Sequence, residues 1–408
     1  MTLSQQYNYV ARGDYESVAG PDWPSFDQFQ IHNNIEQFVY DEIDQMLQPP
    51  ENFNHPAFCV LPFFGLELGV TQTACCLLPA DADIEKIRTE MLSGNRPQEC
   101  AKCWRNEDAN ILSDRQIKNK TLSFLKDITI QNLLDQCEQN QHSVLMLKID
   151  SSNTCNATCV TCGSLSSSAW GALERKNNVI PAKTWRIKIE EFDRQVDYKQ
   201  LSSISFLGGE PFLSSTNFDI LNKILQNNNN NCFVSFVTNG SFELTSEQKS
   251  ILSQFNKVNF CFSIDGIGPV FEYLRYPLKW NNTLNNILWA KNNNIDVSVS
   301  YTVSNINLWY YSKTVDWFRQ HDVNFLVNLV YDPVHFQPSA LPLQLKNTII
   351  SNRVTDCSEL LDILGTHSIQ DDQNYQQFLV EIQKQDLWKG ISITDYLPEF
   401  SEHLSLDQ

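Results

Sequence analysis

The sequence predicts an α/β protein whose parallel sheet curves into a barrel, with a small cysteine-rich unit before the barrel and helices after it. Six short, apolar, β-rich runs recur from about residue 144, and a helical stretch follows each of them. Strands that alternate with helices are typical of a parallel sheet, because each parallel neighbour needs a crossover. Before these runs, cysteines gather among Pro, Gly and short apolar stretches, which is typical of a unit whose metal ligands replace a core.

The barrel is predicted over residues 140–332. Its expected strands are 144–150, 203–207, 232–237, 258–264, 296–302 and 323–330. The gap between the first two strands is long enough for two helices. After Asp332 prolines break the pattern. The C-terminal segment, residues 333–408, is predicted to contain two helical stretches at about 342–364 and 372–388.

Two segments precede the barrel. Residues 1–55 are polar and aromatic without clear periodicity, and within this N-terminal extension we expect one short helix near Ile35–Leu47. Residues 56–125 contain the first group of cysteines and are predicted to form the cysteine-rich unit. The expected order is therefore extension, cysteine-rich unit, barrel and C-terminal helices.

The formal net charge of −18 limits the classes of partner. A chain this acidic repels phosphate backbones and shows no basic stripe, so no nucleic-acid partner is expected. It contains no run of about 18 apolar residues, so no membrane span is expected. The first residues lack the basic start and the apolar stretch of a secretory signal, and the expected location is the cytoplasm.

The 12 cysteines are unevenly distributed. Without a secretion signal, clustered cysteines bind metal or do redox work more often than they form disulfides. Cys232 and Cys261 lie in predicted strands and are expected to be small core residues. Cys137 lies in a polar helix ahead of the barrel, and Cys357 follows the barrel. The remaining cysteines form two groups with different spacing.

The strongest motif is the triplet Cys155, Cys159 and Cys162, which begins just past the first predicted strand. Active sites of barrels and open α/β sheets lie at this carboxyl end. Three thiolates can bind three irons of a four-iron, four-sulfur cluster and leave the fourth iron open to another ligand. The alternatives are a zinc loop that lacks its fourth ligand, or a chance spacing.

A second motif, Gly208-Gly209-Glu210, directly follows the second predicted strand. Two glycines allow the backbone to approach a ligand closely, and the Glu210 carboxylate can receive an ammonium group. This motif is weak alone. It gains weight because it lies one strand after the cysteine triplet.

Together these motifs resemble the radical S-adenosylmethionine (SAM) superfamily, whose pattern is C-x3-C-x2-C followed by GGE. The resemblance covers about residues 56–408 and implies a partial (β/α)6, TIM-like barrel. It also implies that the open iron chelates the amino and carboxylate groups of SAM, with Gly208, Gly209 and Glu210 holding the amino group. The family usually has an aromatic residue before the third cysteine, where this chain has Thr161. That departure changes the packing near the cluster but removes no ligand.

The resemblance implies further SAM contacts. The fourth predicted strand leads to Ser263 and Asp265, and Arg275 follows twelve residues after Ser263. In the peptide-modifying branch of the family, a serine and an arginine at this spacing hold the ribose and the carboxylate of SAM. Thr238 and Asn239 end the third strand and are expected to contact the ribose. The simpler interpretation of these two residues is a strand-to-helix turn with an asparagine cap.

The earlier group of cysteines predicts a four-thiolate site, either a second iron–sulfur cluster or a zinc site. The segment resembles the twitch (SPASM-like) auxiliary-cluster domain of radical SAM maturases, here placed before the barrel. Cys75 matches the motif position, and its neighbour Cys76 is the alternative. A family glycine is offset by one residue, at Gly69. The expected ligands are Cys59, Cys75, Cys100 and Cys103.

The resemblance implies an enzyme that cleaves SAM to a 5′-deoxyadenosyl radical and removes hydrogen from a peptide or small protein. Its expected cofactors are SAM and two 4Fe-4S clusters, and its electrons are expected from an external flavodoxin- or ferredoxin-type donor. The preferred reaction is L-to-D epimerisation in a ribosomally synthesised peptide, with Cys357 as the hydrogen donor. Cys357 is alternatively a buried helix cysteine. The other hypotheses are peptide cross-linking, backbone excision, and a non-catalytic iron–sulfur redox sensor.

Overall fold

The computed structural model describes residues 55–75, 78, 81–108, 113–330, 332–352 and 358–404. The helix predicted near Ile35–Leu47, Cys76 and Cys357 lie outside these residues. Among the described residues, no helix is long and apolar enough to cross a membrane.

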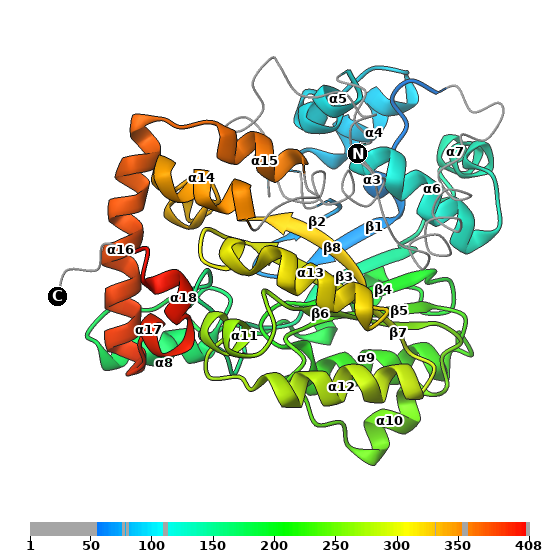
Figure 1. Cartoon of the computed structure of the whole chain (residues 1–408). Helices are drawn as coiled ribbons and strands as arrows, with labels where there is room; N and C mark the ends of the chain where they lie inside the picture. Colours follow the sequence, from blue (N-terminus) through cyan, green and yellow to red (C-terminus); the bar gives the residue numbers. More distant parts are fainter. Residues whose placement is uncertain are drawn as a thin grey trace.

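One sheet of eight strands forms the centre of the described structure, in the order β2-β1-β3-β4-β5-β6-β7-β8. All neighbours from β1 to β8 are parallel, and only β2 is antiparallel to its neighbour. The six predicted strands are β3 to β8 in chain order, which confirms the α/β fold with a partial barrel (Figure 1). The strands are β1 (Gly65–Leu68), β2 (Gln72–Thr73), β3 (Met146–Asp150), β4 (Ser203–Leu207), β5 (Phe233–Thr238), β6 (Val258–Ser263), β7 (Asp296–Val303) and β8 (Asn324–Leu329).

Helices connect the parallel strands and pack on one side of the sheet. The first crossover, which is long enough for two helices, contains one α-helix and two 3₁₀ turns, Ile189–Glu191 and Asp193–Gln195. The helices of the crossovers are α8 (Ser168–Lys176), α9 (Ser215–Gln226), α10 (Ser246–Leu252), α11 (Pro269–Leu274), α12 (Trp280–Asn292) and α13 (Tyr311–Gln320).

The two faces of the sheet differ in polarity. Phe206, Phe236 and Phe260 are fully buried in the main apolar core, whereas alternate positions on the same strands carry half-buried polar side chains. Cys261 belongs to this second set and is half-buried, so the prediction of a core residue is wrong. Its neighbours Phe260 and Phe262 occupy the core instead, because side chains alternate along a strand. Cys232 is fully buried, as predicted.

The cysteine-rich segment has an apolar core of its own. This core includes Phe58, Phe64, Trp104 and Leu133, and it extends past residue 125 into the last helix before the barrel. Cys137 lies in that helix and is buried in the same core. The helices are α3 (Leu61–Phe64), α4 (Ile84–Leu92), α5 (Ala101–Asp108), α6 (Asp114–Lys126) and α7 (Ile130–Glu138).

This segment also contributes two strands that the sequence did not predict. β1 pairs in parallel with β3, so that Gly65 lies opposite Met146 and Leu68 lies opposite Ile149. The cysteine-rich segment is therefore continuous with the sheet of the barrel.

Helices follow the barrel, as predicted. The stretch expected at 342–364 is divided into two helices, and the second stretch is one long helix, α16, which ends before Gly390 in the left-handed conformation (φ 68°). α16 buries Tyr375, Phe378 and Ile382. The helices are α14 (Leu343–Asn352), α15 (Ser358–Gly365), α16 (Ile369–Lys389), α17 (Ile393–Tyr396) and α18 (Pro398–Ser401).

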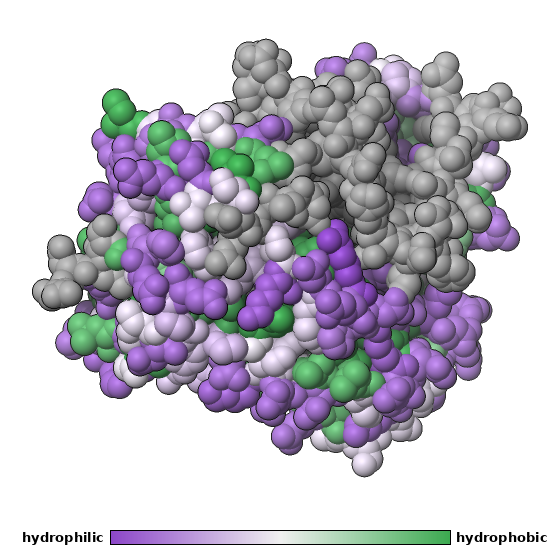
Figure 2. Space-filling view, viewed as in Figure 1, coloured by the Kyte–Doolittle hydropathy of each residue, from purple (hydrophilic) through white to green (hydrophobic). Residues whose placement is uncertain are grey.

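The outer side of α16 carries exposed apolar residues, among them Ile369, Val380 and Leu387. The face of the molecule in Figure 2 is mostly hydrophilic, and its apolar patches are separated from one another. Only one side of α16 packs against the rest of the described structure. On that side, the last turn of α16 contacts the first crossover of the barrel, near α8 (Figure 1).

Candidate functional site

The predicted site residues of the barrel converge at the carboxyl edge of the sheet. The cysteine triplet follows β3, the two glycines follow β4, Asn239 follows β5 and Asp265 follows β6. Carboxyl ends of parallel strands meet at one edge, so these four loops lie side by side.

The cysteine loop between β3 and α8 is anchored through its backbone. The N–H of Cys155 donates to the Ser168 hydroxyl (3.1 Å), and the indole N–H of Trp170 donates to the Cys159 carbonyl (2.8 Å). The N–H of Val160 donates to the carbonyl of Leu274 at the end of α11 (2.8 Å). Contacts from two helices thus position the three thiols.

Cys155 and Cys159 are half-buried residues and Cys162 is an exposed one, and each thiol interacts electrostatically with at least one of the others. Burial raises the pKa of each, that of Cys159 to about 12, while the nearby Arg275 guanidinium acts in the opposite direction on all three. The thiolate is the form that binds metal, so a bound metal must offset the cost of burying this charge.

Among the described residues, no three His, Cys, Asp or Glu side chains are grouped so as to hold one metal ion. A four-iron cluster places a different demand on its ligands, because each thiolate binds its own iron. The donor set of Cys155, Cys159 and Cys162 fits that demand in number, since three thiols on one loop would bind three irons and the fourth iron would have no protein ligand.

Gly208 and Gly209 allow the end of β4 to pack directly against the cysteine loop. Gly208 has φ +102°, and a Cβ atom added to Gly209 would lie 2.2 Å from the Thr154 carbonyl oxygen. The N–H of Gly209 donates to Ser152 (2.8 Å), and the N–H of Glu210 donates to Thr154 (2.8 Å). The sequence predicts that these small residues allow a ligand to approach, whereas in the structure their small size accommodates neighbouring backbone.

Glu210 joins the end of β4 to the end of β5. The side chain is buried, and its carboxylate accepts hydrogen bonds from the Thr238 hydroxyl (2.7 Å) and the Asn239 N–H (2.8 Å). Burial raises its pKa to about 7, against the effect of these hydrogen bonds. Both carboxylate oxygens therefore already accept protein donors, and the role of Glu210 toward an ammonium group stays a prediction.

Asn239 links the turn after β5 to the cysteine loop. Its amide nitrogen lies 3.9 Å from the Cys155 sulfur and donates to the side chain of Asn156 (3.0 Å). Its side-chain oxygen accepts from the Ser241 N–H (2.9 Å) and closes a turn, as in the simpler interpretation, but the asparagine cap of that interpretation is wrong, since Thr245 caps α10. The contact with the cysteine sulfur was not predicted from the sequence.

Arg275 and Asp265 form a buried ion pair beside the three thiols. Their closest atoms are 2.9 Å apart, and the side chains are 12% and 9% exposed. The backbone carbonyl of Asp265 accepts a further hydrogen bond from Asn307 (2.7 Å). Within the described part of the chain, the Nε of Arg275 is buried and makes no hydrogen bond. The guanidinium thus retains a donor for an anionic or hydroxyl group.

Ser263 occupies the last position of β6, opposite Ser300 of β7. It lies on the half-buried, polar face of the sheet, two residues before Asp265. This position places its hydroxyl group at the same sheet edge as Asp265.

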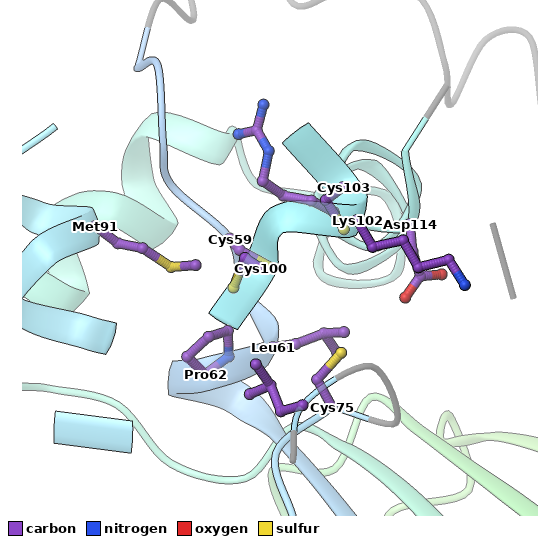
Figure 3. A pocket seen from close by; sticks show the side chains of 11 residues that line it. Cys59, Leu61, Pro62, Cys75, Met91, Cys100, Lys102, Cys103 and Asp114 are labelled. Atoms are coloured by element: carbon purple, nitrogen blue, oxygen red, sulfur yellow. The ribbon is translucent and has the colours of Figure 1, made fainter. Parts of the chain in front are cut away.

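A second site lies in the cysteine-rich segment. The four predicted ligands line one cavity, with Cys100 and Cys103 on the turn that opens α5 and Cys75 on the far side, near Leu61 (Figure 3). Burial raises the pKa of Cys100 to about 11 and of Cys103 to about 12, and it raises that of Cys59 well above its usual range. Four thiols that line one cavity fit an iron–sulfur cluster, in which each thiolate binds its own iron.

Arg115 lines this cavity and is rigidly held. It forms an ion pair with Glu107 (2.6 Å) and donates to the Phe58 carbonyl (2.7 Å), beside Cys59. This cation lowers the pKa of Cys59 against the larger effect of burial. The site therefore contains a built-in positive charge next to the thiols.

No family model matches this sequence, and no curated protein matches it significantly. The solved structures that resemble it include anSMEcpe with bound AdoMet, at 18% identity and a TM-score of 0.38, with 51% of this chain and 58% of that chain covered. SuiB of Streptococcus suis bound to the precursor peptide SuiA has 15% identity and a TM-score of 0.36, with 66% of this chain and 58% of that chain covered. TsrM, a radical SAM methyltransferase from Kitasatospora setae, has 14% identity and a TM-score of 0.30, with 45% of this chain and 36% of that chain covered. We therefore infer the chemistry of the site from its own residues.

Proposed function

We propose that this chain is a radical SAM enzyme whose 4Fe-4S cluster is held by Cys155, Cys159 and Cys162. The observation that carries the proposal is the convergence of three thiols with the Arg275 guanidinium at the carboxyl edge of a parallel sheet. When reduced and bound to SAM, such a cluster supplies a 5′-deoxyadenosyl radical that removes a hydrogen atom from the substrate.

The residues around the thiols have separate roles in this proposal. Arg275 donates from its unused Nε to a SAM carboxylate or hydroxyl, and Asp265 fixes the plane of the guanidinium. Ser263 and the turn of Thr238 and Asn239 face the ribose. The backbone at Gly208 and Gly209 receives the amino group, and Glu210 holds β4 and β5 in register for that contact.

In the second site we propose an auxiliary 4Fe-4S cluster bound by four thiols. The cavity shared by these thiols supports this assignment. Structural zinc is the alternative, as is Cys76 in place of Cys75. The proposed ligands are Cys59, Cys75, Cys100 and Cys103.

For the substrate we propose a ribosomally synthesised peptide, on the basis of the sequence resemblance to radical SAM maturases. The reaction that we favour is L-to-D epimerisation, and the alternatives are cross-linking and backbone excision. Electrons come from a flavodoxin- or ferredoxin-type donor. A redox sensor is a less suitable function, because it has no need for the unused donor of Arg275 beside the cluster.

Reductive SAM cleavage is the direct test of the proposed function. Reconstituted protein that is reduced with dithionite in the presence of SAM should form 5′-deoxyadenosine, measured by liquid chromatography and mass spectrometry. Omitting either dithionite or SAM is the control. A protein that contains its clusters and forms no 5′-deoxyadenosine would fit the redox sensor and contradict the proposal.

The Cys357→Ala variant tests epimerisation. A thiol is a good hydrogen-atom donor because its S–H bond is weaker than most C–H bonds. In the variant, SAM cleavage should continue while formation of the D-residue falls sharply. Both are measured with a precursor peptide whose gene neighbours the gene of this protein.

The wild-type enzyme in heavy water should place one deuterium on each epimerised residue, because the thiol proton exchanges with solvent. Wild-type epimerisation by the Cys357→Ala variant, or a product lighter by two hydrogens, would refute this role and indicate cross-linking.

A further inference from the structure

A cation from the C-terminal helix lies beside the cysteine loop. Lys389 is the last residue of α16, and its ammonium group lies 4.9 Å from the centre of the Trp170 ring. It donates a hydrogen bond to the Gln385 side chain (2.9 Å). A lysine in the last helical turn complements the helix dipole wherever its side chain points. Here the side chain lies over Trp170, the residue that donates to the Cys159 carbonyl.

The two partners of Lys389 both bind the cysteine loop. Trp170 is buried and holds the carbonyl of Cys159, and Gln385 is buried and donates to the carbonyl of Val160 (3.0 Å). Burial lowers the pKa of Lys389 to about 8, so that the ammonium form predominates at pH 7, and this group interacts electrostatically with the thiols of Cys159 and Cys162. It is therefore held beside the cysteine loop by two residues that also bind the backbone of this loop.

Two acidic groups interact electrostatically with Lys389, but neither forms an ion pair with it among the described residues. Asp386 accepts from the Tyr273 hydroxyl (2.9 Å) and from the Ile393 N–H (2.7 Å). Glu381 is paired with Lys384 and also accepts a hydrogen bond from the Gln385 side chain (3.1 Å). The hydrogen-bond partner of Lys389 itself is the neutral amide of Gln385, so its charge is not cancelled by a direct ion pair within the described residues.

We propose that Lys389 raises the reduction potential of the cluster held by Cys155, Cys159 and Cys162. This inference rests on the proposed function. Reduction transfers one electron from an external donor to the cluster, which adds one negative charge and changes no bond to the protein. A cation in a partly dehydrated position stabilises the more negative, reduced form more than the oxidised form. Lys389 is thus not a ligand of the cluster and acts on its reduction potential through its positive charge.

The test is a redox titration monitored by electron paramagnetic resonance, with dithionite as reductant and no SAM. A change of the spectrum on later addition of SAM identifies the signal of this cluster. Lys389→Met should have a more negative midpoint potential than the wild type, and Lys389→Arg should stay close to the wild type. The matched control is Lys257→Met, because Lys257 is exposed and directly precedes β6, at the edge of the sheet opposite the cysteine loop.

A Lys389→Met variant with full iron content and a wild-type potential would overturn the inference and leave the proposed function intact. If the Lys389→Met variant loses its iron, its potential cannot be measured, and the iron content of three Lys389 variants is compared instead. Iron kept in Lys389→Arg and lost in both Lys389→Met and Lys389→Gln supports the role of charge. Iron lost in all three variants shows a packing role and refutes the inference. A wild-type protein that binds no cluster would overturn the proposed function as well.

Discussion

Changing Cys155, Cys159 and Cys162 together to alanine is expected to abolish 5′-deoxyadenosine formation and to halve the bound iron. Two four-iron clusters correspond to about eight irons per chain, and the triple variant should retain about four. The loss is specific because these thiols lie on one loop, whereas the other four ligands line a cavity in a segment with its own core. Iron analysis and the cleavage assay measure the two effects.

The matched control is Cys232→Ala, because Cys232 is fully buried in the main core and belongs to neither group. It should keep the iron and the cleavage activity, with only the modest loss of stability that a small cavity causes. A triple variant that retains all its iron would show that the cluster is bound elsewhere, and one that still cleaves SAM would exclude these ligands from the reaction.

The barrel strands could be predicted because their apolar runs are short, β-rich and separated by helical stretches. β1 and β2 were missed for a physical reason. They are four and two residues long, and the pairing of β1 with β3 depends on residues about eighty positions apart. Local periodicity contains no information about such a pairing. The sequence does contain the signal that places Cys261 with Ser263, since Phe260 and Phe262 alternate with them.

The site could be predicted where its functional residues belong to one short motif, as in the cysteine triplet. The contacts that support this motif could not be predicted. Asn239, after β5, contacts the sulfur of Cys155, after β3. Gln385 of α16 donates to the carbonyl of Val160, which lies 225 positions earlier in the chain. No spacing rule relates such residues, because the order of the strands in the sheet brings the first pair together and the packing of α16 on the barrel brings the second pair together. For the same reason Lys389 had no signal in the sequence.

Arg275→Met should abolish SAM binding and strongly destabilise the fold. The variant leaves the Asp265 carboxylate buried without its partner, and breaking such a buried pair costs about 3–5 kcal/mol. Chemical denaturation measures the free energy of unfolding, and titration with SAM measures binding. Iron content is measured in parallel, because the guanidinium also influences the three thiols.

The double variant Asp265→Asn with Arg275→Met separates the two losses. It removes both charges, so no carboxylate is left unpaired, and much of the stability should return. SAM binding should stay absent, because the guanidinium that donates to the ligand is still missing. If the double variant regains SAM binding together with its stability, Arg275 only supports the fold, and its assignment as a SAM contact is wrong. If stability returns while binding does not, Arg275 contacts the ligand, and the buried pair with Asp265 orients it for that contact.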